Sequence, residues 1–138
     1  MTEAFALLLL RIFIGAVFFF QGYDKVFRVK ISGVADAFRY DLETRNLPRP
    51  LITSAAFFTS YIELIGGFLL VLGLFKLPVL YLLTVDVVVA SVAFSIIKPM
   101  WNMQHVFPRL VILMALLLLP QEWDWFTIDA YLPYIPTF

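Results

Sequence analysis

Four ionisable residues lie inside long apolar stretches of this sequence: Arg11, Glu63, Asp86 and Arg109. A charge near the centre of a lipid bilayer costs about 2.5–3.5 kcal/mol on insertion scales, so such side chains do not face lipid. Two positive and two negative groups can satisfy one another or line a water-filled cavity. The chemistry open to them is the binding of a polar ligand or the relay of protons. We expect any functional site at this set of residues.

The same four residues also suit a purely structural role. Ion pairs between Arg11 and Glu63 and between Asp86 and Arg109, or the crossed pairs, would fix the register of neighbouring helices. The sequence shows no redox centre, and no catalytic residue is assigned. The structural interpretation and the ligand-binding interpretation therefore both stand.

The composition indicates whether this protein folds in water or in a membrane. The chain is 62% hydrophobic and 14% charged, with a mean hydropathy of +0.93. Soluble domains are about 45–50% apolar and about 25% charged, so the membrane is the natural environment. The absence of cysteine excludes disulfides and cysteine-ligated clusters, and the single histidine, His105, excludes a bis-histidine haem within this chain. We predict no metal site and no cofactor held by this chain.

Four stretches are long and apolar enough to cross a hydrocarbon core of about 30 Å. They cover about residues 4–23, 51–75, 78–97 and 101–119. The connection from Lys76 to Pro78 is short, which predicts an antiparallel hairpin of the second and third spans. We therefore predict an all-α, four-helix antiparallel bundle, with residues 1–138 forming one membrane domain that ends in a tail over residues 120–138.

The fourth span contains Pro108, which either kinks the helix or begins a shorter one. A helix running only from Pro108 to Leu119 would not cross the bilayer. With full-length spans and a rise of 1.5 Å per residue, the four ionisable residues fall in a layer about 8 Å thick. The shorter fourth helix would remove Arg109 from that layer.

Small residues accompany the charged positions. Gly15 and Gly22 lie on the Arg11 face of the first span, and Gly66 and Gly67 lie within one turn of Glu63. Small residues let transmembrane helices approach closely. The charged faces are therefore predicted to be the faces through which the helices contact one another.

The segment 24–50 differs from the spans, because it mixes basic and acidic residues. Val34, Phe38 and Leu42 recur every four residues, which predicts a short amphipathic helix in the membrane interface. The segment carries six Lys and Arg residues and Lys98 adds a seventh on the same side, whereas the opposite side has only Lys76. Because Lys and Arg mark the cytoplasmic side, both termini are predicted to lie outside.

Several motifs resemble the DoxX family. They are LLRIFIGAVFFFQGYDKVF (residues 9–27), NLPRPL (46–51), IELIGGFLLVLGLF (62–75) and FPRLVILMALLLL (107–119). The glutamate followed by paired glycines in the third motif is the most specific of them. The resemblance covers nearly the whole chain and implies a four-helix protein of the bacterial inner membrane. It also implies that Arg11, Glu63 and Arg109 form the polar core, whereas Asp86 is not part of every member's pattern.

The resemblance guides the functional expectation. Some DoxX proteins are membrane subunits of thiosulfate:quinone oxidoreductase, and others are linked to oxidative-stress complexes. We expect a non-catalytic membrane subunit or anchor, in contact with lipid and with another subunit or a second copy. A quinone would come only through a partner, and no nucleic acid is expected. The alternatives are a small-molecule or proton-coupled transporter that uses the charge layer, and a membrane chaperone or assembly factor.

Overall fold

The computed structural model describes residues 1–42, 48–97 and 106–131, and within these ranges the chain forms helices and no strand. The prediction of an all-helical protein is confirmed. The helices are α1 (Thr2–Tyr23), the π-helix η1 (Asp24–Arg28), α2 (Lys30–Leu42), α3 (Arg49–Leu72), α4 (Lys76–Ile97), α5 (Val106–Leu118), and the 3₁₀ turns η4 (Gln121–Trp123) and η5 (Ile128–Tyr131).

Three of these helices are long and apolar enough to cross a membrane. They are α1 continued by η1, then α3, and then the first 18 residues of α4. Their positions agree with the first three predicted spans. Large apolar side chains are exposed along all three, as expected of surfaces that face lipid rather than water. The chain is therefore a membrane protein with several apolar helices.

The fourth predicted span is shorter than expected in the described part of the chain. Helix α5 begins at Val106 and has 13 residues, which at 1.5 Å per residue is about 20 Å. Residues 101–105 of the predicted span lie outside the described residues. Pro108 is the third residue of α5 and lies in its first turn, where a missing backbone N–H breaks no helical hydrogen bond.

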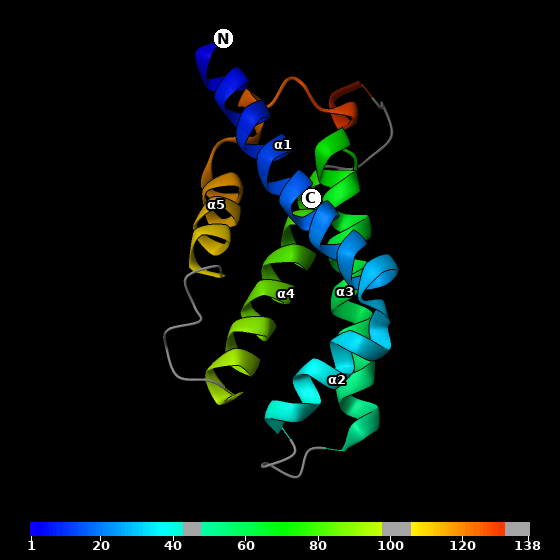
Figure 1. Cartoon of the computed structure of the whole chain (residues 1–138). Coiled ribbons are helices and arrows are strands. Elements are labelled where there is room, and N and C mark those ends of the chain that lie inside the picture. Colours follow the sequence, from blue (N-terminus) through cyan, green and yellow to red (C-terminus); the bar gives the residue numbers. More distant parts are fainter. Residues whose placement is uncertain (43–47, 98–105, 132–138) are drawn as a thin grey trace.

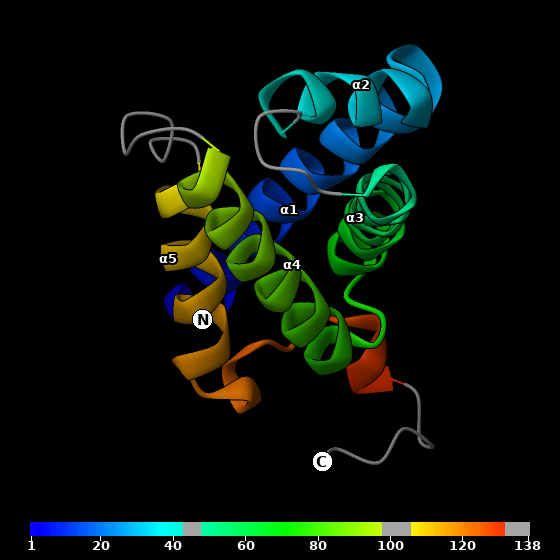
Figure 2. The ribbon, with the colours of Figure 1, turned by 90° about the horizontal axis from the view of Figure 1, so that it is seen from below.

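The helices pack in a defined order. Helix α1 makes its most extensive contact with α3, while α4 lies between α3 and α5 (Figure 2). Helix α2 packs against α3, where Val34 and Ala35 meet Ile52 and Ala56. Part of the apolar face of α2 is thus covered by protein. The side chains of Phe38 and Leu42, the other predicted apolar positions, lie outside the described residues.

Glycines permit the close approach of α1 and α3. A Cβ atom added at Gly22 would overlap the backbone of Leu64, and one added at Gly67 would overlap the backbone of Phe19. A Cβ at Gly15 would lie 3.0 Å from the carbonyl oxygen of Gly67. Gly66 instead faces Leu83 of α4. The four glycines therefore lie at helix–helix contacts, as small residues in membrane helices commonly do.

A tight turn joins α3 to α4. Gly73 ends α3 in the left-handed conformation, with φ 68° and ψ 36°. Its N–H donates to the carbonyl of Leu70, and the N–H of Leu74 donates to the carbonyl of Leu69. This pattern satisfies carbonyls that the helix end would leave free. The turn makes α3 and α4 an antiparallel hairpin, and it lies at the same end of the molecule as the N-terminus (Figure 1).

Candidate functional site

Arg11 is the most deeply buried cation among the described residues, with 1% of its surface exposed. Its Nη1 atom donates to the carbonyl of Leu70 at 3.3 Å, and its Nη2 atom donates to the carbonyl of Phe126 at 2.5 Å. Its Nε atom lies 3.6 Å from Oδ2 of Asp124. The guanidinium group of α1 therefore joins the end of α3 to the tail.

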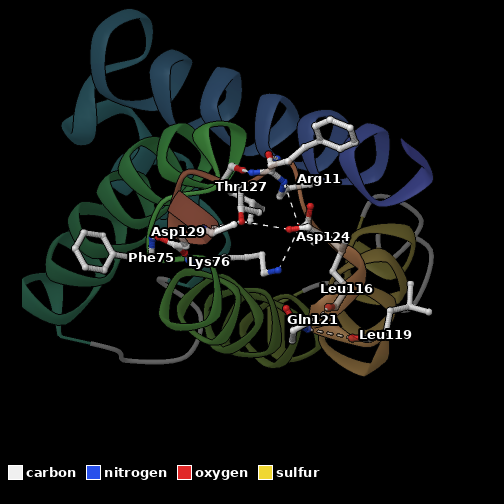
Figure 3. A network of polar contacts seen from close by, with 12 residues as sticks. Arg11, Phe75, Lys76, Leu116, Leu119, Gln121, Asp124, Thr127 and Asp129 are labelled. Carbon is white, nitrogen blue, oxygen red and sulfur yellow. Dashed lines mark hydrogen bonds and ion pairs between the residues drawn. The ribbon is translucent and has the colours of Figure 1, made fainter. Parts of the chain in front are cut away.

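Asp124 lies between the two 3₁₀ turns of the tail and is 6% exposed. Besides Arg11, it contacts Lys76, whose Nζ atom donates to Oδ2 of Asp124 at 3.2 Å. Lys76 is the first residue of α4, so one carboxylate connects two helices to the tail (Figure 3). Such a shared carboxylate compensates two buried positive charges at once.

Asp129 provides a second attachment of the tail. Its two carboxylate oxygens accept hydrogen bonds from the N–H groups of Phe75 and Lys76, at 2.9 and 2.8 Å. Its own N–H donates to the carbonyl of Gly73 at 3.2 Å. Free N–H groups at a helix N-terminus favour a carboxylate, so Asp129 caps α4. Arg11, Lys76, Asp124 and Asp129 are hereafter called the tail cluster.

A small cavity adjoins the tail cluster. It has a volume of about 10 Å³, and its lining includes Arg11, Lys76, Gln121 and Asp124. That is room for about one water molecule, whereas pockets for small-molecule ligands measure about 300–1,000 Å³. Nε of Arg11 and Oδ1 of Asp124 have no hydrogen-bond partner among the described residues. The cavity beside the tail cluster therefore has room for about one water molecule and is too small for a small-molecule ligand.

A second set of charged residues lies between the helices, farther from the tail. Nζ of Lys25 lies 2.5 Å from Oε2 of Glu63, with the Lys25 side chain 31% exposed and Glu63 buried. Glu63 also lies close enough to interact electrostatically with Asp86 on α4 and with Arg109 on α5. Lys25, Glu63, Asp86 and Arg109 are hereafter called the Glu63 cluster.

Helix register explains why the two carboxylates of the Glu63 cluster are neighbours. Gly66 of α3 meets Leu83 of α4. In an antiparallel pair, Glu63, which precedes Gly66 by three residues, lies level with Asp86, which follows Leu83 by three. Glu63 is bound to Lys25, but Asp86 is buried without an ion pair or hydrogen bond to any described residue. Within the described part of the chain, the cluster thus contains one carboxyl group in an ion pair, Glu63, and one without, Asp86.

The predicted pairs of charges differ from those in the structure. Arg11 pairs with Asp124 and not with Glu63, and Glu63 pairs with Lys25. No ion pair joins Asp86 to Arg109 in the part of the chain that the structure describes. The single predicted layer is divided between two clusters, because Arg11 extends to the end of the bundle that the tail covers.

Sequence reasoning missed four members of these clusters: Lys25, Lys76, Asp124 and Asp129. The prediction considered only charges inside the predicted spans, and Lys25 lies just beyond the end of the first span at residue 23. A signal for the tail was present, since Asp124 and Asp129 lie among aromatic residues on the predicted side of the membrane that has a single basic residue, Lys76. An acid in such a segment needs a partner if the segment packs against the bundle.

The fold and the two clusters define a class: an integral membrane protein of apolar helices with ionisable groups buried between them. The model of the DoxX family matches residues 6–96, and the chain belongs to the DoxX family. This finding confirms the resemblance noted in the sequence motifs. The matched range contains Arg11, Glu63 and Asp86 and ends before α5 and the tail. No curated protein and no solved structure matches the chain significantly.

Proposed function

We propose that this DoxX protein is a non-catalytic membrane subunit or anchor of a larger, redox-linked complex in the bacterial inner membrane. The tail cluster is the observation that supports this role most. Its charges bind one another and the backbone, and its cavity has room for about one water molecule. Charges used in this way stabilise a scaffold. Nε of Arg11 and Oδ1 of Asp124 have no hydrogen-bond partner among the described residues, but the cavity that these two residues line is too small for a substrate. A quinone would then be bound through a partner subunit.

The proposed arrangement in the membrane is a four-helix antiparallel bundle, with α5 as the fourth member beside α4 and α1. Helix α2 lies in the cytoplasmic interface, and both termini lie outside. The asymmetry of Lys and Arg supports this orientation. The packing of α2 on α3 supports a position beside the bundle rather than within it.

Partner identification after purification in a mild detergent tests the proposed role. We expect the tagged protein, expressed from its own chromosomal locus, to co-purify in constant ratio with a soluble or membrane-bound redox protein. An unrelated membrane protein with the same tag serves as the control for carry-over. Isolation of this chain alone, or only as a homo-oligomer, would contradict the subunit role.

The Glu63 cluster favours a second candidate function, a proton-coupled transporter or ligand-binding bundle. Its supporting observation is Asp86, a buried carboxyl group with no partner among the described residues. Ionisable residues inside membrane proteins commonly mark ion or proton pathways. Vesicles loaded with pyranine and subjected to a pH gradient test this function. Proton entry should exceed that of empty vesicles, fall in Asp86→Asn and persist in Glu122→Gln. Entry equal to that of empty vesicles would reject a proton pathway through Asp86.

A further inference from the structure

The tail reverses the usual arrangement of polar and apolar side chains. Five large apolar residues are exposed within nine positions: Trp123 (43%), Trp125 (71%), Phe126 (53%), Ile128 (41%) and Tyr131 (79%). Asp124 and Thr127, which alternate with them, are only 6% and 4% exposed. A tail in contact with water would present the acids and bury the aromatic rings. A cluster of apolar side chains on this scale indicates a surface that something covers.

The buried polar groups hold the tail in this orientation. Asp124 and Asp129 attach it to α1, to the α3–α4 turn and to the start of α4. Thr127 strengthens the backbone between them, because its hydroxyl donates to the carbonyl of Asp124 and accepts from the N–H of Ala130, both at 3.3 Å. The exposed aromatic side chains are therefore presented by an anchored segment.

The position of the tail identifies the surface that covers it. The tail crosses the end of the bundle where α1 begins, α3 ends, α4 begins and α5 ends (Figures 1 and 2). Three of those helices are candidate membrane spans, so this end lies at the level of the lipid headgroups. Trp and Tyr prefer that level, because the ring is apolar and its N–H or O–H group reaches water.

We propose that residues 121–131 form a clasp that binds the headgroup region of the phospholipid leaflet on the side of the termini. Asp124 and Asp129 fasten the clasp to the bundle, and the aromatic side chains enter the lipid interface. The segment contains no Lys or Arg, so its binding relies on partition of apolar side chains and not on attraction to lipid phosphates. The clasp would set the depth of the bundle, independently of any partner subunit.

Quenching of tryptophan fluorescence tests the clasp. Trp101→Phe and Trp123→Phe leave Trp125 as the only tryptophan of the full chain. In vesicles of phosphatidylcholine and phosphatidylglycerol, lipids brominated near the headgroup should quench Trp125 more than lipids brominated near the chain end. Its emission should be blue-shifted and poorly quenched by aqueous iodide. Asp124→Asn should release the tail, with a red shift and a loss of lipid quenching, whereas Glu122→Gln should leave both unchanged.

Two other quenching patterns would each have a clear meaning. Trp125 quenched by iodide and not by either lipid would show a tail in water, and Trp125 quenched by neither would show a surface covered by protein. Each result would overturn the clasp. Should Asp124→Asn fail to fold, the depth profile of the parent protein and the Asp129→Asn variant decide the matter. None of these measurements requires a partner, so they fail or succeed separately from the proposed subunit role.

Discussion

Individual charged residues join the helices and the tail of this structure. Asp124 compensates Arg11 and Lys76 together, beside a cavity with room for about one water molecule. Glu63 and Lys25 form a simpler pair with one end open to the surroundings, since the Lys25 side chain is 31% exposed. Removal of one partner from a buried pair leaves the other charge uncompensated, which costs more than the pair itself contributes. The two clusters should therefore respond differently to mutation.

Asp124→Asn tests the tail cluster. The variant leaves Arg11 and Lys76 without their shared counter-ion, so we expect a loss of about 3–5 kcal/mol in unfolding free energy. Thermal unfolding in detergent measures it. Glu122→Gln, an exposed acid two residues away, should change stability little. A stability for Asp124→Asn equal to that of Glu122→Gln would show that Asp124 does not hold the tail.

Glu63→Gln tests the pairing inside the bundle. The change leaves the Lys25 ammonium group without its carboxylate, and we expect a clear fall in unfolding temperature. Lys25→Gln should partly restore stability in the double variant, because the unpaired charge is then removed. Arg11→Gln should not rescue Glu63→Gln, since Arg11 belongs to the other cluster. Rescue by Arg11→Gln and not by Lys25→Gln would reverse this assignment.

At the scale of elements, the closest contact is between α1 and α3. Gly22 and Gly67 let the two backbones touch, and each would direct an added Cβ atom at the backbone of the opposite helix. A backbone cannot move aside as a flexible side chain does. Contact of this kind replaces hydrophobic burial, which does not drive helices together when the surroundings are lipid.

Gly67→Ala tests the α1–α3 contact. We expect the variant to be destabilised by about 1–3 kcal/mol, although alanine is the better helix former, because overpacking separates the helices. Gly33→Ala is the matched control in a helix, where the added Cβ meets only the side chain of Val29 at 3.1 Å. Unfolding in detergent, followed by circular dichroism, compares the two. Equal stability of Gly67→Ala and Gly33→Ala would contradict the close packing described here.

The whole molecule has two unlike ends. One end holds the N-terminus, the α3–α4 turn and the anchored tail, whereas α2, which belongs to the basic segment, lies toward the other end (Figure 1). This asymmetry of charge and structure suits a protein inserted in a single orientation.

Site-directed labelling tests the orientation. The chain has no cysteine, so Ser32→Cys and Thr137→Cys each introduce a unique thiol. In intact spheroplasts, a membrane-impermeant maleimide should label Thr137→Cys and not Ser32→Cys, because the basic segment is retained in the cytoplasm. Both positions should react after lysis. Labelling of Ser32→Cys alone from outside would invert the proposed topology.

The class of protein, the first three apolar helices, the α3–α4 hairpin and the family could all be predicted from the amino-acid sequence. These features follow from local properties: hydropathy summed over about 20 residues, a short turn and motifs of contiguous residues. The sequence also identified Arg11, Glu63, Asp86 and Arg109 as ionisable groups that need compensation, since the cost of a charge in lipid depends on residue type and depth.

Which charged groups contact one another could not be predicted without the packed structure. Arg11 and the tail carbonyl it binds are 115 residues apart, and their contact requires the tail to fold back over the end of the bundle. Likewise, Lys25 reaches Glu63 because η1 continues the line of α1 beside α3. Two side chains form an ion pair only when their charged atoms lie within a few ångströms of each other. That separation depends on the rotation and tilt of both helices and on the side-chain conformations. Periodicity along the chain specifies which face a residue occupies, but not the partner that the packed helices bring to it.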